Sequence, residues 1–153
     1  MSNQYTRKSR ESLSSEFIRW LRVVGDHSEE LIGEQLKPFG LSVSQGFLFG
    51  LIADLALKGG VPLQKDLERD MRLATSSITN LVQGLERKGL VFRMDSATDG
   101  RAKELRVTRE GWKVRKELGR HVSDWELALT SSLTDEELAA VVKLLRKMGR
   151  SYE

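Results

Sequence analysis

Cationic side chains are concentrated near the middle of this 153-residue chain, in the stretch VFRMDSATDGRAKELRVT (residues 91–108). Arg93, Arg101 and Lys103 surround a segment whose Asp99 and Gly100 are typical of a turn. A simple hairpin turn explains the aspartate and the glycine, but it requires none of the surrounding cations. Cations grouped in this way are suited to binding the phosphates of a polyanion such as nucleic acid.

Uncharged polar side chains form a second group, just before this loop, on one face of a predicted helix. All of them form hydrogen bonds and none is a carboxylate, so the face is suited to contact with base edges and phosphates. An ordinary solvated face usually carries Glu and Lys, which favour helix more than Ser, Thr or Asn do. We therefore prefer a DNA-reading face to a merely solvated one. Its residues are Ser76, Ser77, Thr79, Asn80, Gln83 and Arg87, and we add Gln64 from the start of the preceding helix.

Two short predicted helices position this face. Pro62 is expected in the first turn of a helix that ends near Met71, and a tight turn, RLAT, follows. Thr75 or Ser76 is then expected to cap a second helix that ends at Gly89. Two short helices joined by a tight turn make a helix-turn-helix. The apolar faces are Leu63, Leu67 and Met71 in the first helix, and Ile78, Leu81, Val82 and Leu85 in the second.

Alternating apolar and charged residues on both sides of the loop predict a two-stranded ribbon. Its apolar members are expected to pack on the preceding helices, so that the loop projects as a wing. Beside a recognition helix in the major groove, a wing tip lies over the adjacent minor groove, where Arg101 is the expected contact. Asp99 is expected to pair with Arg101 or to cap the loop, while Arg93 and Lys103 are expected to contact phosphates.

Amphipathic helices are predicted on both sides of this central region. The first, within residues 9–38, ends at Pro38 and Gly40; a nearly all-apolar helix follows, capped by Ser42 or Ser44. Residues 109–152 predict two more helices, the last beginning with a capping box of Thr134 and Glu137. The outer helices carry more apolar surface, including Trp20, than a small central unit can cover, which indicates contact with a partner chain.

Composition excludes several functional classes. The net charge is +3, but residues 61–120 carry fourteen Lys/Arg against nine Asp/Glu, so the basic excess lies in the centre. The sequence contains no Cys, which excludes disulfides and thiolate metal sites. The serines have no glycine-flanked nucleophile elbow, so no catalytic residues are expected and the chain is not predicted to be an enzyme. The absence of a signal peptide or membrane-length apolar run favours a cytoplasmic protein without membrane contact.

The run LERKGLVFRMDSATDGRAKELRVTREG (residues 85–111) resembles the multiple antibiotic resistance regulator (MarR) family. The family pattern is Leu-Glu-x-x-Gly-Leu-Val-x-Arg, then Asp-x-Arg-x-Lys, then Leu-Thr-x-x-Gly. Val107 stands here in place of the last Leu. Many members have two adjacent arginines after the Asp; this chain has Gly100 followed by Arg101.

The resemblance covers nearly the whole chain and implies a mainly α fold with a small β-wing. In this reading residues 1–153 form one MarR-type domain. Residues 41–108 form a winged helix-turn-helix lobe, and residues 9–38 and 109–152 form dimerisation helices. The implied function is a ligand-responsive repressor that binds a pseudo-palindromic site in double-stranded DNA as a homodimer.

The resemblance also implies a small-molecule inducer, bound between the dimer helices and the DNA-binding lobe, and no other cofactor. Trp20, His27 and Phe47 are candidates for its pocket, although aromatic residues at helical spacing are more often ordinary core. Asp26, His27 and Glu30 suggest a metal site only weakly, because a closed transition-metal site usually needs more His or Cys, and we predict none. A winged helix used only for protein contacts is the other alternative, and its complexes should be insensitive to salt.

Overall fold

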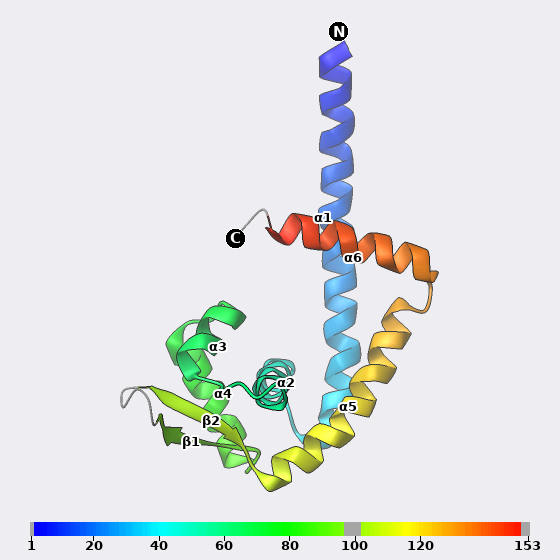
Figure 1. The fold of residues 1–153 in the computed structure, drawn as a ribbon. Helices are drawn as coiled ribbons and strands as arrows, with labels where there is room; N and C mark the ends of the chain where they lie inside the picture. The colour runs from blue at the N-terminus through cyan, green and yellow to red at the C-terminus, as the bar shows by residue number, and fades with distance from the viewer. Residues whose placement is uncertain (1, 97–101, 151–153) are drawn as a thin grey trace.

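The computed structural model describes the backbone of residues 2–96 and 102–150, and the side chains from residue 9 onward within those ranges. In these ranges the chain forms six α-helices, one short 3-10 helix and two strands (Figure 1). A lobe of short elements lies to one side of a long helix; α5 (Arg109–Thr130) rises from the lower end of that helix on the other side, and α6 (Asp135–Gly149) crosses the long helix in this view. The mainly α fold with a β-wing is thus confirmed.

The long helix α1 (Ser2–Leu36) begins earlier than predicted and ends near the expected position. Pro38 lies in the short helix η1 (Lys37–Phe39), and Gly40 then ends it with a left-handed φ of 62°. The N-terminal part of α1 extends well beyond the other elements (Figure 1), and the residues described from 9 to 27 are all exposed.

Helix α2 (Val43–Leu57) forms the floor of the lobe. Ser42 is its N-cap, as one of the two predicted candidates, and it forms a reciprocal capping box with Gln45. The helix buries Leu48, Phe49 and Ile52 in the core. Across the described residues no single helix is long and apolar enough to cross a membrane; only α1 and α2 taken together, across a 75° bend, meet that measure.

Helices α3 (Gln64–Met71) and α4 (Thr75–Arg87) form the predicted helix-turn-helix. Two local predictions were wrong. Pro62 precedes the N-cap Leu63 instead of lying in the first turn, because its carbonyl oxygen accepts a hydrogen bond from the Leu105 N–H at 2.9 Å. The N-cap of α4 is Ala74, whose side chain makes no cap, because the Thr75 hydroxyl points to α3.

Strands β1 (Val91–Asp95) and β2 (Lys103–Val107) pair antiparallel as the predicted ribbon, with Arg93 opposite Leu105. A bridge between Leu63 and Glu104 adds a short third segment to the ribbon. The expectation that the apolar members pack inward holds for Val91 and Leu105. It fails for Phe92 and Met94, which are 46% and 43% exposed. Successive residues of a strand point to opposite faces, so these two side chains point away from the face on which Val91 packs inward.

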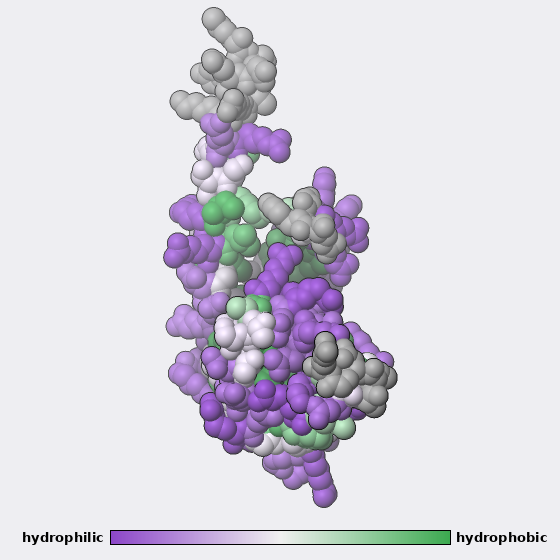
Figure 2. Space-filling model, turned by 90° about the vertical axis from the view of Figure 1, so that its left-hand side faces the viewer, coloured by the Kyte–Doolittle hydropathy of each residue, from purple (hydrophilic) through white to green (hydrophobic). Residues whose placement is uncertain are grey.

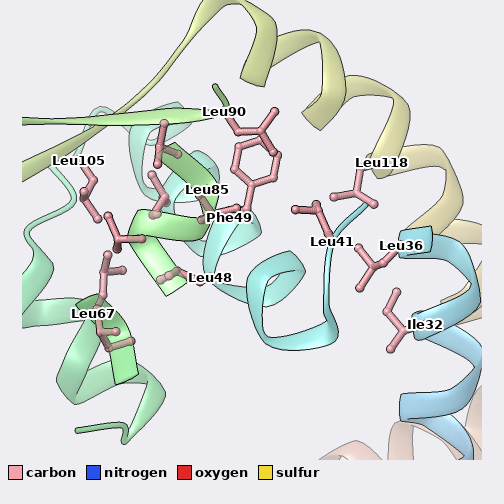
Figure 3. Packing of buried hydrophobic residues seen from close by; sticks show 14 residues of the cluster. Ile32, Leu36, Leu41, Leu48, Phe49, Leu67, Leu85, Leu90, Leu105 and Leu118 are labelled. Atoms are coloured by element: carbon pink, nitrogen blue, oxygen red, sulfur yellow. The ribbon is translucent and has the colours of Figure 1, made fainter. Parts of the chain in front are cut away.

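One hydrophobic cluster joins the lobe to the long helices (Figure 3). Leu48, Phe49, Leu67 and Leu85 are fully buried at its centre. The cluster continues to the end of α1 and to α5 (Arg109–Thr130), and its members there are Ile32, Leu36 and Leu118. Helix α6 (Asp135–Gly149) starts with the predicted capping box of Thr134 and Glu137, but none of its residues is buried.

Candidate nucleic-acid interface

Helix α4 presents the predicted polar face to solvent. Thr79 is half-buried and the other five residues of that face in α4 are exposed: Ser76, Ser77, Asn80, Gln83 and Arg87. The opposite side of the helix is fixed in the core by Ile78, Val82 and Leu85. An amphipathic helix of this kind keeps its polar side available while its apolar side sets its orientation.

Two side-chain hydrogen bonds hold α3 against α4. The Gln64 Nε2 donates to Thr79 Oγ1 at 3.1 Å, and the Thr75 Oγ1 donates to Glu68 Oε2 at 2.8 Å. The turn between the helices is tight, since Arg72 adopts a left-handed φ of 51°. Gln64 and Thr79 were predicted to contact DNA; the structure pairs them with each other, so they also orient the helix that carries the exposed face.

Arg93 is held by a carboxylate of α4. Its Nε lies 3.1 Å from both carboxylate oxygens of Glu86, and its Nη2 donates to Oε2 at 2.5 Å. Glu86 also accepts from the backbone N–H of Arg93. About a quarter of each side chain is exposed. The guanidinium thus fixes β1 on α4. The phosphate contact expected of Arg93 stays a prediction.

This ion pair changes how the protein responds to acid. Hydrogen bonding to Arg93 lowers the pKa of Glu86 below its ordinary value of 4.5. A carboxylate with a lowered pKa adds stability above its unfolded-state pKa, and that stability is lost as the pH falls through the folded-state pKa.

We expect Glu86→Gln to lower the free energy of unfolding by about 1 to 2 kcal/mol at neutral pH. The difference from wild type should shrink at acidic pH, because Glu86 then becomes protonated in the wild-type protein too. Urea unfolding at a series of pH values measures this. Glu110→Gln is the matched control, because its pair with Lys113 is exposed. An equal effect of both substitutions would contradict the role given to Glu86.

The two strands of the wing carry further charges. Lys103 pairs with Asp95 across the two strands, and both side chains are at least half exposed. Arg106 donates to the buried carboxylate of Glu104 at 2.7 Å. Asp99 and Arg101, the predicted residues of the wing tip, lie outside the described residues.

A cavity of about 320 Å³ lies between α1, α2 and α5. Phe47 lines it, as predicted for the ligand pocket, but Trp20 and His27 are not among its lining residues. Trp20 lies further along α1, where Arg19 stacks over its ring at 5.0 Å. Where side chains are described, no three His, Asp or Glu come together as a metal site requires, and this includes Asp26, His27 and Glu30.

Sequence reasoning missed the contacts made between elements. Glu86 is the Glu of the family pattern Leu-Glu-x-x-Gly, which could have marked it as a structural residue. Its partner, Arg93, depends on how β1 folds back on α4. Arg115, Leu118 and Trp125 of the cavity are contributed by α5, more than 60 residues after Phe47. No local pattern in the sequence indicates that these segments meet.

Comparisons with known proteins give a consistent result. The MarR family profile matches residues 39–102. The chain is 28% identical over 132 residues to the HTH-type transcriptional regulator MhqR of Bacillus subtilis (strain 168), covering 86% of this chain and 85% of MhqR. It is 30% identical over 100 residues to the HTH-type transcriptional regulator FarR of Neisseria gonorrhoeae, covering 65% of this chain and 68% of FarR.

Solved structures share the fold. The MepR–DNA complex of S. aureus superposes with a TM-score of 0.80 at 25% identity, covering 90% of this chain and 98% of MepR. A mutant MarR of E. coli complexed with operator DNA superposes with a TM-score of 0.77 at 24% identity, covering 85% of this chain and 91% of MarR.

Proposed function

The chain belongs to the MarR family of DNA-binding transcriptional regulators, and from that premise we propose that it acts as a homodimeric, ligand-responsive repressor on a pseudo-palindromic operator. In this proposal residues 41–108 form the DNA-binding lobe, and residues 9–38 and 109–152 form the dimerisation region. The small-molecule effector acts from the cavity between them.

The observation that carries the proposal is the exposed, carboxylate-free face of α4 beside the wing. Ser76, Asn80 and Gln83 have no role in the core, and α4 is braced by α3 and β1 so that its direction is fixed. A helix held in this way can enter the major groove with its polar side toward the bases, while the wing follows the backbone.

The apolar surface of the outer helices supports the homodimer. Figure 2 shows apolar side chains on the upper part of the molecule, where Figure 1 places α1 and α6, whereas the side with the wing is largely hydrophilic. Contiguous exposed apolar surface of this kind usually marks an interface. A two-fold symmetric dimer would present two α4 helices to successive major grooves, about 10 base pairs apart. The exposed residues include Leu13, Phe17, Ile18, Trp20, Leu21 and Val24 of α1, and Val141, Leu144, Leu145 and Met148 of α6.

Two substitutions separate base reading from backbone contact. Asn80→Ala should cost about 1 to 3 kcal/mol at particular base pairs, because a bidentate contact to a base is lost. Arg101→Ala should weaken binding to every duplex, and by about the same factor whatever the base sequence. A phosphate or minor-groove contact carries little sequence information. Gel shifts on the operator and on its single-base variants distinguish the two effects.

Ser123→Ala, an exposed substitution on α5, is the matched control and should bind as wild type does. Wild-type affinity of both Asn80→Ala and Arg101→Ala would contradict the proposed interface. The competing function, a winged helix that contacts only proteins, makes a different prediction for salt. If the protein neutralises DNA phosphates, the logarithm of its DNA-binding constant should fall linearly with the logarithm of the salt concentration. A binding constant that does not change with salt would favour protein contacts.

A further inference from the structure

The guanidinium of Arg93 has a second hydrogen-bonding edge that the subunit does not use. Glu86 accepts from the edge formed by Nε and Nη2, at distances of 2.5 to 3.1 Å. Among the described residues nothing accepts a hydrogen bond from Nη1. The side-chain nitrogens of those residues that are both unpaired and buried belong to Arg115 and Trp125, so the Nη1 of Arg93 is open to solvent. The edge formed by Nη1 and Nη2 can therefore donate to an acceptor outside the subunit.

This edge lies beside the polar face of α4. Glu86 follows Thr79 by seven residues and Gln83 by three, so the three side chains lie along one border of that face. A helix with its side chains is about 10 to 12 Å across and the major groove is about 12 Å wide, so the borders of a helix in the groove face the two sugar-phosphate walls. Arg93 is thus held where a backbone phosphate of bound DNA is expected.

The chemistry of the open edge suits a phosphate. A planar guanidinium can donate two parallel hydrogen bonds to two phosphate oxygens. Restraining a long side chain on binding costs free energy, and Glu86 has already restrained this one before DNA arrives. The carboxylate also offsets the charge of the arginine at long range, so the pair gives the contact its direction and adds little overall attraction.

We propose that Glu86 and Arg93 form a preoriented phosphate clamp at the border of the polar face of α4. Arg93 is the binding residue, and its Nη1 and Nη2 donate to two oxygens of one backbone phosphate. Glu86 is a positioning residue, because it holds the guanidinium and does not itself touch DNA. This inference rests on the proposed function, since it adds a named phosphate contact to the proposed interface. A brace that only fixes β1 on α4 is the competing role.

Neutral methylphosphonate linkages test the contact directly. They are placed at one symmetric pair of positions at a time in a duplex that the protein has selected from a random library. One pair should weaken wild-type binding by about 10-fold or more, as expected when a charged hydrogen bond is lost. Arg93→Gln should weaken binding to the unmodified duplex to a similar extent, and that pair of linkages should then have no further effect. If Arg93→Gln responds to every linkage as wild type does, the clamp is overturned.

Glu86→Gln separates positioning from charge by the sign of its effect. Removing a carboxylate beside DNA should raise affinity if charge alone matters. If Glu86 orients Arg93, the same substitution should instead lower affinity by about 3- to 10-fold. Its salt dependence should stay that of wild type because the cation remains, whereas Arg93→Gln should reduce the slope by about 1 per subunit. Fluorescence anisotropy over a salt series measures both quantities, at a temperature where circular dichroism shows each variant folded.

Asp95→Asn is the matched control for loss of a carboxylate. Asp95 also pairs with a cation of the wing, Lys103, but its side chain is 70% exposed. The lysine has a flexible stem and a compact charge, so it needs no partner to set its direction. Asp95→Asn should therefore bind DNA as tightly as wild type or more tightly.

The outcomes separate this inference from the proposed function. Tighter binding by Glu86→Gln than by wild type would overturn the positioning role. An equal loss of affinity in Glu86→Gln and Arg93→Gln, with an equal change in salt dependence, would identify a brace and overturn the clamp. Failure of the wild-type protein to select any duplex would instead contradict the proposed function itself, and the clamp with it.

Discussion

Leu145→Glu is expected to separate the subunits and to lower operator affinity by about 100-fold or more, although the residue lies far from the DNA-reading face. Leu145 is 45% exposed at the centre of an apolar stripe on α6, formed with Leu138, Val141, Val142 and Met148. In a homodimer this stripe becomes buried, and an unpaired carboxylate buried there is strongly unfavourable. A single lobe then loses the benefit of binding two half-sites at once.

Sedimentation velocity measures the dissociation, and gel shifts measure the loss of affinity. Ala140→Glu is the matched control, since it adds the same charge at an exposed position of α6 away from the stripe. A dimer that forms and binds DNA equally well in both variants would show that α6 takes no part in the interface.

Gly111→Ala is expected to produce the largest loss of stability among single methyl additions. A Cβ at this position would lie 2.2 Å from the carbonyl oxygen of Leu90 and 2.8 Å from a methyl carbon of Val107. The first clash is with backbone, which cannot rotate away, so the first turn of α5 must move off the end of β1. The same turn is fixed by Thr108, whose Oγ1 accepts from the Gly111 N–H at 2.8 Å and donates to the Gly89 carbonyl oxygen at 2.6 Å.

The expected cost is about 1 to 3 kcal/mol or more, the range of overpacked sites. Gly50→Ala in α2 is the control, because a Cβ there meets nothing within 4 Å. That variant should be neutral or more stable than wild type, since alanine favours helix over glycine. Thermal unfolding of the three proteins measures both effects, and equal stability of Gly111→Ala and wild type would show that the junction adapts without strain.

Local sequence signals predicted the elements of this fold well. The N-cap at Ser42, the capping box at Thr134, the helix-turn-helix and the ribbon are all set by residues close together in the chain, so the pattern alone indicates them. Pro62 was misplaced because its position depends on Leu105, which lies more than 40 residues later. The N-cap of α4 was misplaced because Glu68 takes the hydroxyl of Thr75.

The candidate site was predicted in part. Exposure of Ser76, Asn80 and Gln83 follows from helical periodicity, which identifies the polar face. The pairing of Arg93 with Glu86 does not follow, because it requires the angle at which the wing meets α4. In the cavity, helical spacing identifies an apolar face of α1 but not the position along α1 at which α2 and α5 approach. Ile32 therefore lines the cavity, whereas the predicted Trp20 and His27 do not.

Selection from a random duplex library tests the central claim most directly, because it assumes no particular operator sequence. Sequencing of the DNA retained by the purified protein should show an inverted repeat whose half-sites lie about 10 base pairs apart, centre to centre. Enrichment of a single unpaired half-site, or of no sequence at all, would contradict a symmetric pair of DNA-reading lobes.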